Sequence, residues 1–166
     1  MSDAEIAAAA TRVLDAARAG GLKIATAESC TGGLVAGALT DIAGSSDVVE
    51  RGFVTYSNEA KMEMLGIEEA TLIAHGAVSR QTTEAMAVGA IRRSIADLAV
   101  AITGIAGPGG GTAEKPVGLV HFGAAARDGR HQYHERRFGD IGRAEVRRRS
   151  VLVALEMLEK LANSES

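Results

Sequence analysis

Three segments of this chain read as an apolar strand that ends in a polar or glycine-rich turn, a pattern typical of α/β sheets. The turns comprise residues 28–33, 56–61 and 103–111. The carboxyl ends of parallel strands share one edge of a sheet, and ligands bind in the crevice at that edge. We therefore predict that Ser29 and Lys61 reach one pocket, with Tyr56 and Thr103 at the same edge. A serine and a lysine that meet there indicate a hydrolase.

Capping residues, helical spacing and glycine stops predict five helices. Residues 2–5 resemble a capping box, and the apolar side chains that follow repeat at helical spacing. Gly20 and Gly21 end this first helix. The other helices are expected at about 32–42, 58–65, 79–94 and 142–163.

The strand pattern predicts a mixed sheet. Strands are expected at about 22–28, 50–56 and 97–103, and the last of these is almost wholly apolar, as in a buried central strand. Residues 117–126 and 130–138 flank Asp128-Gly129, which is a hairpin signal. Because a hairpin makes at least one strand antiparallel, we predict one three-layer α/β/α domain over residues 1–166. Its sheet should be mostly parallel, with a C-terminal β-hairpin.

The composition restricts the partners of the chain. Aromatic residues make up 3% of it, with no tryptophan, and the net charge is −3. Base stacking and phosphate attraction are therefore weak, so nucleic acid is not expected as a partner. The single cysteine, the acidic N-terminus and the lack of an apolar run of about 18 residues predict a soluble cytoplasmic protein without a membrane contact. The short apolar helices allow a homo-oligomer.

The serine turn has two interpretations. Ser29 can be a nucleophile at a helix N-terminus, where free N–H groups suit an oxyanion or a phosphate. Alternatively, Ser29 or Thr31 only caps that helix. Cys30 is a rival nucleophile, since the helix dipole would also stabilise a thiolate. However, neighbouring residues should not both point into one pocket, and no histidine follows at a comparable strand end.

Lys61 is the candidate base. A lysine takes a proton only when it is neutral, which requires burial, nearby positive charge or a helix N-terminus to lower its pKa. Lys61 falls in the first turn of an expected helix, where cations are disfavoured. Tyr56, at the preceding strand end, could join the same hydrogen-bond network.

The glycine-rich loop lacks the spacing of a Walker A or dinucleotide-binding motif. It is either a flexible crossing loop or a backbone cradle for a nucleotide. His131 and His134 would face opposite sides of a strand, so neither a metal site nor a cofactor is expected.

Helical phase separates the arginines near the C-terminus. An apolar stripe is expected at Ala144, Val151, Ala154, Leu155, Leu158 and Ala162. Arg147 falls inside this stripe, Arg143 at its margin and Arg149 on the opposite side. We therefore predict that Arg147 points inward, where an anionic ligand or a buried carboxylate neutralises it.

Together these motifs resemble the CinA carboxy-terminal domain family. The resemblance rests on residues 27–33, 52–61, 103–110 and 118–120 and on Arg143-x-x-Val146-Arg147, and it extends from about residue 5 to 160.

The resemblance implies hydrolysis of the carboxamide of nicotinamide mononucleotide, a small-molecule nucleotide, to nicotinate mononucleotide and ammonia. It implies Ser29 as nucleophile and Lys61 as base, assisted by Tyr56. The substrate-binding residues expected from it are Cys30, Thr31, Gly32, Gly33, Thr103, Gly104, Gly107, Gly109, Arg143 and Arg147. The alternatives are a nucleotide-binding regulatory module without turnover and a DNA-associated protein that uses the arginine-rich helix.

Overall fold

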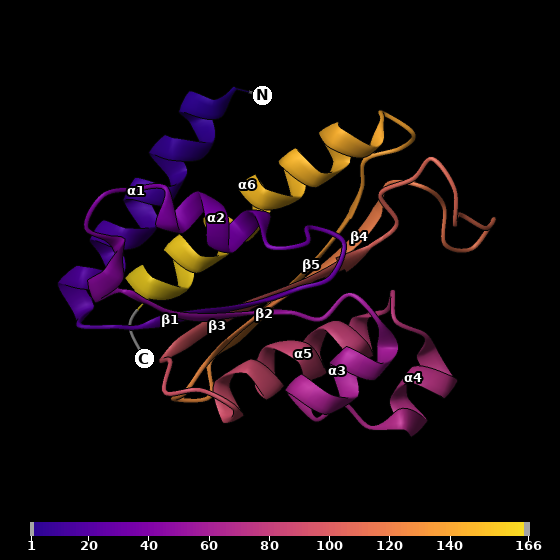
Figure 1. Cartoon of the computed structure of the whole chain (residues 1–166), viewed down its shortest axis with the longest axis horizontal. Coiled ribbons are helices and arrows are strands. Elements are labelled where there is room, and N and C mark those ends of the chain that lie inside the picture. Colours follow the sequence, from indigo (N-terminus) through magenta and orange to yellow (C-terminus); the bar gives the residue numbers. More distant parts are fainter. Residues whose placement is uncertain (1, 165–166) are drawn as a thin grey trace.

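The computed structural model describes residues 2–164 and places one five-stranded sheet between two layers of helices (Figure 1). The strands are β1 (Ile24–Glu28), β2 (Val49–Val54), β3 (Leu98–Gly104), β4 (Leu119–Ala126) and β5 (His131–Arg137). The α-helices are α1 (Asp3–Gly20), α2 (Leu34–Thr40), α3 (Asn58–Leu65), α4 (Glu69–His75), α5 (Arg80–Arg92) and α6 (Arg143–Asn163). A short 3₁₀ helix, η1, covers Ser45–Asp47.

The sheet has the strand order β2-β1-β3-β4-β5. Strand β1 pairs in parallel with both β2 and β3, whereas β4 runs antiparallel to β3 and β5. The predicted three-layer α/β fold with a mixed sheet and a hairpin around Asp128-Gly129 is therefore confirmed. Parallel β2, β1 and β3 bring their carboxyl ends, and the three polar turns, to one edge.

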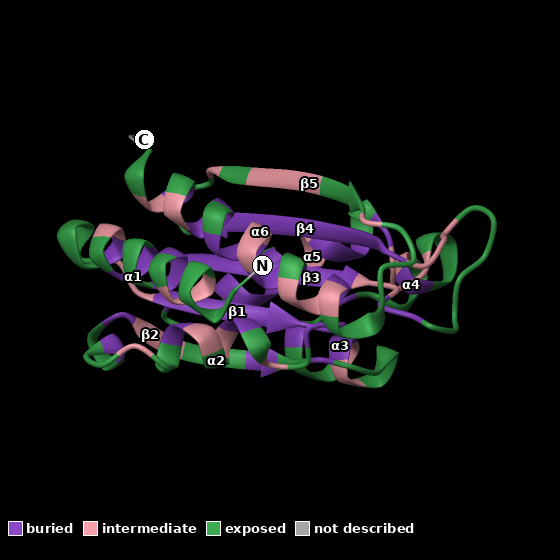
Figure 2. Ribbon diagram, turned by 90° about the horizontal axis from the view of Figure 1, so that it is seen from above, coloured by how far each residue is buried: buried purple, intermediate pink, exposed green. Residues whose placement is uncertain are grey.

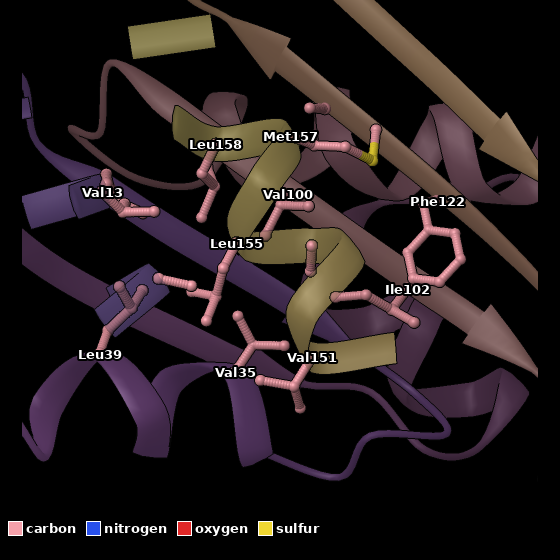
Figure 3. Packing of buried hydrophobic residues seen from close by; sticks show 14 of the residues in the cluster. Val13, Val35, Leu39, Val100, Ile102, Phe122, Val151, Leu155, Met157 and Leu158 are labelled. Atoms are coloured by element: carbon pink, nitrogen blue, oxygen red, sulfur yellow. The ribbon is translucent and has the colours of Figure 1, made fainter. Parts of the chain in front are cut away.

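Two helical layers cover opposite faces of the sheet. Helices α1, α2 and α6 lie on one face, and α3, α4 and α5 lie on the other (Figure 1). Strands β1, β3 and β4 are buried, whereas the edge strands β2 and β5 are largely half-buried or exposed (Figure 2). Figure 3 shows the larger core, in which aliphatic side chains of α1, α2 and α6 pack on β3 and β4.

The structure confirms the predicted helix caps at Ser2 and Ser79. The Ser2 side chain accepts a hydrogen bond from the Glu5 amide and the Glu5 side chain accepts one from the Ser2 amide, each at 3.2 Å. Ser79 caps α5 by accepting from the Thr82 amide at 3.1 Å. Helix α2 is shorter than predicted, because Gly33 takes a left-handed φ of 104° and the helix begins only after it.

Two features differ from the sequence-based expectation. Helix α4 was not predicted, since it buries only Leu72 and has no capping side chain. The stripe on α6 begins at Val146, which is fully buried, whereas Ala144 is exposed. Ala144 lies in the first turn of α6, next to Arg143. Within residues 2–164, none of the helices combines the length and hydropathy of a transmembrane span.

Candidate active site

Side-chain alternation at the end of β1 sends neighbouring residues into opposite layers. Ala25 and Ala27 pack in the core on the α5 side, so Glu28 points to the other face, toward α2. Ser29 follows and points back toward α3. The two polar residues at the strand end therefore have separate surroundings and separate roles.

Lys61 lies on α3, the helix that follows β2, and its side chain contacts Ser29 at the end of the neighbouring strand β1. Its Nζ atom lies 3.1 Å from the Ser29 Oγ atom, 2.8 Å from the Thr55 carbonyl oxygen and 3.2 Å from the Tyr56 carbonyl oxygen. The lysine is only 1% exposed. No carboxylate of the described residues lies within 4.0 Å of Nζ, so no counterion stabilises its charge.

Burial lowers the pKa of Lys61 from its ordinary value of 10.5, because a charged amine is poorly solvated in the interior. The two carbonyl oxygens can only accept hydrogen bonds, so Nζ donates to both. A neutral amine then has one lone pair left, and the remaining short contact is with the Ser29 hydroxyl. This arrangement allows Lys61 to accept the serine proton.

A cavity of about 290 Å³ opens at this edge of the sheet. The sequence-predicted residues that line it are Ser29, Cys30, Tyr56, Lys61, Thr103, Gly104, Gly107, Gly109 and Arg143. The remaining lining residues are Ala77, Val78, Ile105, Ala106 and Gly110. The three turns therefore meet in one cavity, as the sequence predicted.

Tyr56 and Arg143 form a polar rim rather than part of the lysine network. The Arg143 Nη2 atom donates to the Tyr56 hydroxyl at 3.1 Å, and Nη1 donates to the Gly107 carbonyl at 2.8 Å. Tyr56 is 61% exposed, and only its main-chain carbonyl contacts Lys61. The tyrosine side chain thus reaches the arginine, whereas the expected contact of its hydroxyl with the lysine is not observed.

Cys30 lines the cavity but is a buried residue of the core beneath α2 and α6. Burial raises the pKa of its thiol to about 12, so the thiolate is disfavoured. Burial therefore works against the thiolate that a helix dipole would stabilise. Helix α2 begins four residues later, at Leu34, and its first amides are already occupied.

These amides are occupied by Glu28, which lies in the first of the three predicted turns but had no predicted role. Its carboxylate accepts from the amides of Val35 and Ala36 at 2.8 and 3.1 Å. It also accepts from the Thr31 hydroxyl at 2.6 Å. A carboxylate directly after a buried strand and before a helix is the signal that could have identified it, since anions are stabilised at helix N-termini.

Four predicted substrate-binding residues do not line the cavity: Thr31, Gly32, Gly33 and Arg147. The Arg147 guanidinium instead donates to the Cys30 carbonyl from Nε at 3.1 Å and to the Thr31 carbonyl from Nη2 at 3.3 Å. Backbone carbonyls thus occupy the place where helical phase suggested an anionic ligand or a carboxylate. Arg149 pairs with Glu145 on the surface at 2.9 Å, as expected for its face of the helix.

Thr103 and His121 have structural contacts. Thr103 is buried and donates from Oγ1 to the Ala77 carbonyl at 3.0 Å, which ties β3 to the segment before α5. The Nδ1 atom of His121 is hydrogen-bonded to the Tyr133 hydroxyl. Residues 2–164 contain no group of three His, Cys, Asp or Glu side chains that could hold a metal ion.

Comparison with known proteins relates the chain to one family. The model of the CinA C-terminal domain matches residues 6–162. Nicotinamide-nucleotide amidohydrolase PncC of Escherichia coli (strain K12) is 51% identical over 159 residues, which are 95% of each chain. A putative competence-damage inducible protein of Caldicellulosiruptor bescii is 50% identical over 139 residues, and the chain covers only 33% of that relative.

A solved structure agrees with these matches. The competence/damage inducible protein CihA from Agrobacterium tumefaciens has 59% identity and a TM-score of 0.94, with 96% of both chains covered. A CinA superfamily protein from Klebsiella pneumoniae has 38% identity and a TM-score of 0.90. Sequence, fold and family model thus agree over nearly the full length, and the chain belongs to the CinA C-terminal domain family.

Proposed function

We propose that this protein is an amidohydrolase that converts nicotinamide mononucleotide to nicotinate mononucleotide and ammonia. The observation that carries the proposal is the contact of 3.1 Å between Lys61 Nζ and Ser29 Oγ at the wall of a cavity, where no carboxylate of residues 2–164 lies within 4.0 Å of the lysine amine. The name of the E. coli relative, which is 51% identical, supplies the substrate class. A nucleophile within hydrogen-bond reach of its base is the geometry that acyl transfer requires.

In the first step, Ser29 Oγ attacks the carboxamide carbon and its proton passes to Lys61 Nζ. The tetrahedral intermediate then collapses, and the bond between carbon and nitrogen breaks. Lys61 returns the proton to the departing nitrogen, which leaves as ammonia. The product of this half-reaction is an ester of Ser29 with the nicotinate group.

In the second half-reaction, water attacks the ester carbon and gives a proton to Lys61. The bond to Ser29 Oγ breaks, the serine regains its proton from the lysine, and nicotinate mononucleotide leaves. Lys61 is thus neutral at the start and at the end of each half-reaction, and it carries the extra proton only within each half-reaction, while the tetrahedral intermediate exists. The cationic pyridinium of the substrate adds to burial in favouring the neutral amine.

The carbonyl groups around Lys61 are suited to both protonation states of its amine. Thr55 and Tyr56 accept hydrogen bonds from Nζ both before and after protonation, because each needs only one N–H group. The third N–H of the ammonium then points toward Ser29 Oγ, which in the tetrahedral intermediate is bonded to the carbon that also carries the departing nitrogen.

Arg143 is the group we assign to the substrate phosphate. Its guanidinium lies at the exposed rim, where Gly107 and Tyr56 fix two of its donors and others stay available. Charge-assisted, bidentate hydrogen bonds make arginine well suited to phosphate. Gly104, Gly107 and Gly109 line the same cavity as Ser29 and Arg143, and we expect the nucleotide to lie against them.

The test is turnover by the purified protein. We expect release of ammonia and nicotinate mononucleotide in equal amounts from nicotinamide mononucleotide, in the presence of a metal chelator. Ser29→Ala should bind the nucleotide but release neither product. Nucleotide binding by the wild type without ammonia release would instead support a regulatory nucleotide-binding module.

A further inference from the structure

The turn that carries Ser29 is held by a buried carboxylate on one side. Glu28 is 0% exposed, and its three hydrogen bonds engage the Thr31 hydroxyl and the first amides of α2. No Lys, Arg or His nitrogen of the described residues lies within 4.0 Å of this carboxylate. The amides and the hydroxyl must therefore stabilise the buried charge by themselves, which makes their geometry strict.

The same turn is held by a guanidinium on the other side. Arg147 extends from α6 and donates to the carbonyl oxygens of Cys30 and Thr31. Thr31 is the point where the two contacts meet, since its hydroxyl donates to Glu28 and its carbonyl accepts from Arg147. The residues directly before and after Ser29 are thus anchored from two different elements.

Neither Glu28 nor Arg147 lines the cavity. Both nevertheless fix the backbone on which Ser29 stands, together with the hydrogen bond from the Ser29 amide to the Ile102 carbonyl at 2.9 Å. We propose that Glu28 and Arg147 are positioning residues, which hold Ser29 Oγ in place against Lys61 Nζ without touching the substrate. This proposal rests on the proposed function, in which Ser29 is the nucleophile.

The two roles open to Arg147 predict different kinetics. A substrate-binding arginine raises KM when it is removed, whereas a positioning residue lowers kcat because the nucleophile moves away from its base and target. A misplacement of about 1 Å can cost roughly 100-fold in rate. The groups that we assign to the nucleotide, Arg143 and the glycine-rich wall, are not themselves changed by substitution of Glu28 or Arg147, so a positioning role predicts little change in KM.

The experiment compares Glu28→Gln, Arg147→Met and Arg147→Lys with Arg149→Met, a control on the exposed face of the same helix. Glutamine keeps the size of Glu28, but its amide group faces N–H donors that need an acceptor. Each variant is assayed for kcat, KM, melting temperature and the rate at which a fluorophosphonate labels Ser29, followed by intact mass. Labelling reports on the nucleophile without requiring the nucleotide to bind.

We expect Glu28→Gln and Arg147→Met to lower both kcat and the labelling rate by about tenfold or more, with KM within about threefold of wild type. Arg147→Lys keeps the charge and one donor, so it should recover part of both rates even if the methionine variant folds poorly. Arg149→Met should match the wild type in every readout.

Two results would overturn the proposal. Folded variants that are labelled and turned over at wild-type rates, with only a lower melting temperature, would show that the contacts serve stability alone. A large rise in KM at unchanged kcat in Arg147→Met would assign Arg147 to the substrate. Failure of the proposed function gives a distinct pattern, in which even the wild type neither labels at Ser29 nor releases ammonia.

Discussion

The amine of Lys61 meets the hydroxyl of Ser29 at 3.1 Å across 32 residues of sequence, because the strands before them run in parallel. The last residues of β1 and β2, Glu28 and Val54, stand side by side in the sheet. The Thr55 amide continues this pairing by donating to the Glu28 carbonyl at 2.8 Å. Helix α3 begins shortly afterwards, so its first turn lies beside the serine turn.

Loss of the serine hydroxyl should abolish turnover and leave the fold intact. We expect Ser29→Ala to release no ammonia, while Cys30→Ala keeps most of the activity, because burial keeps the Cys30 thiol protonated. Circular dichroism and steady-state kinetics on both variants test this. An active Ser29→Ala together with an inactive Cys30→Ala would make the cysteine the nucleophile.

Replacement of Lys61 by arginine should be inactivating although it preserves a cation. A guanidinium does not deprotonate in proteins and cannot serve as a base. In the wild type, kcat/KM should fall on the acidic side as Lys61 becomes protonated below its lowered pKa. A Lys61→Arg variant with near-normal rates, or a flat acidic limb, would remove the lysine from the mechanism.

The buried lysine should also leave a signature in stability. Below pH 10.5 the unfolded chain carries the Lys61 proton, whereas the folded chain loses it above its lowered pKa. Between these two pKa values the unfolded state binds more protons, so the free energy of unfolding rises with pH. We expect urea unfolding to show this rise in the wild type relative to Lys61→Met. Parallel pH profiles of the two proteins would mean that folded Lys61 keeps its charge.

Replacement of Gly89 in α5 by alanine should not stabilise the protein, although this change usually stabilises a helix. Glycine to alanine inside a helix commonly stabilises by about 0.5–1 kcal/mol, which we expect for Gly37→Ala on the open side of α2. At Gly89, however, a Cβ atom would overlap the carbonyl of Leu65, the last residue of α3. Gly89→Ala should therefore lower both stability and activity, since α3 carries Lys61. Thermal melts and ammonia release on this pair of variants test the difference, and equal melting temperatures would refute the clash.

Arg143 at the rim should control nucleotide affinity. A hydrogen bond to a charged group contributes about 1.5–3 kcal/mol, so Arg143→Ala should raise KM by roughly 10- to 100-fold. Tyr56→Phe, which only removes a partner of the arginine, should have a smaller effect in the same direction. An unchanged KM in Arg143→Ala would place the phosphate elsewhere.

The sequence was sufficient for the sheet, the hairpin and the meeting of the three turns, because these follow from apolar runs, glycine positions and the shared edge of parallel strands. Helix α4 could not be predicted from the sequence, because a helix with one buried residue shows almost no apolar periodicity. For Arg147, helical phase gave the correct side of α6 but not the partner, which is the backbone of a distant loop. The role of Glu28 depends on where α2 begins, and the conformation of Gly33 decides that position.

Strand β2 has consequences for how activity is lost. It pairs only with β1, and with α3 it forms the outermost unit of the sheet. Proteins open in cooperative parts, and weakly buried edges open before the core. Detachment of this unit would carry Lys61 away from Ser29 while the central strands stay folded. Mild denaturant would then abolish the activity before the protein unfolds globally. Loss of activity would therefore report local unfolding at this edge of the sheet.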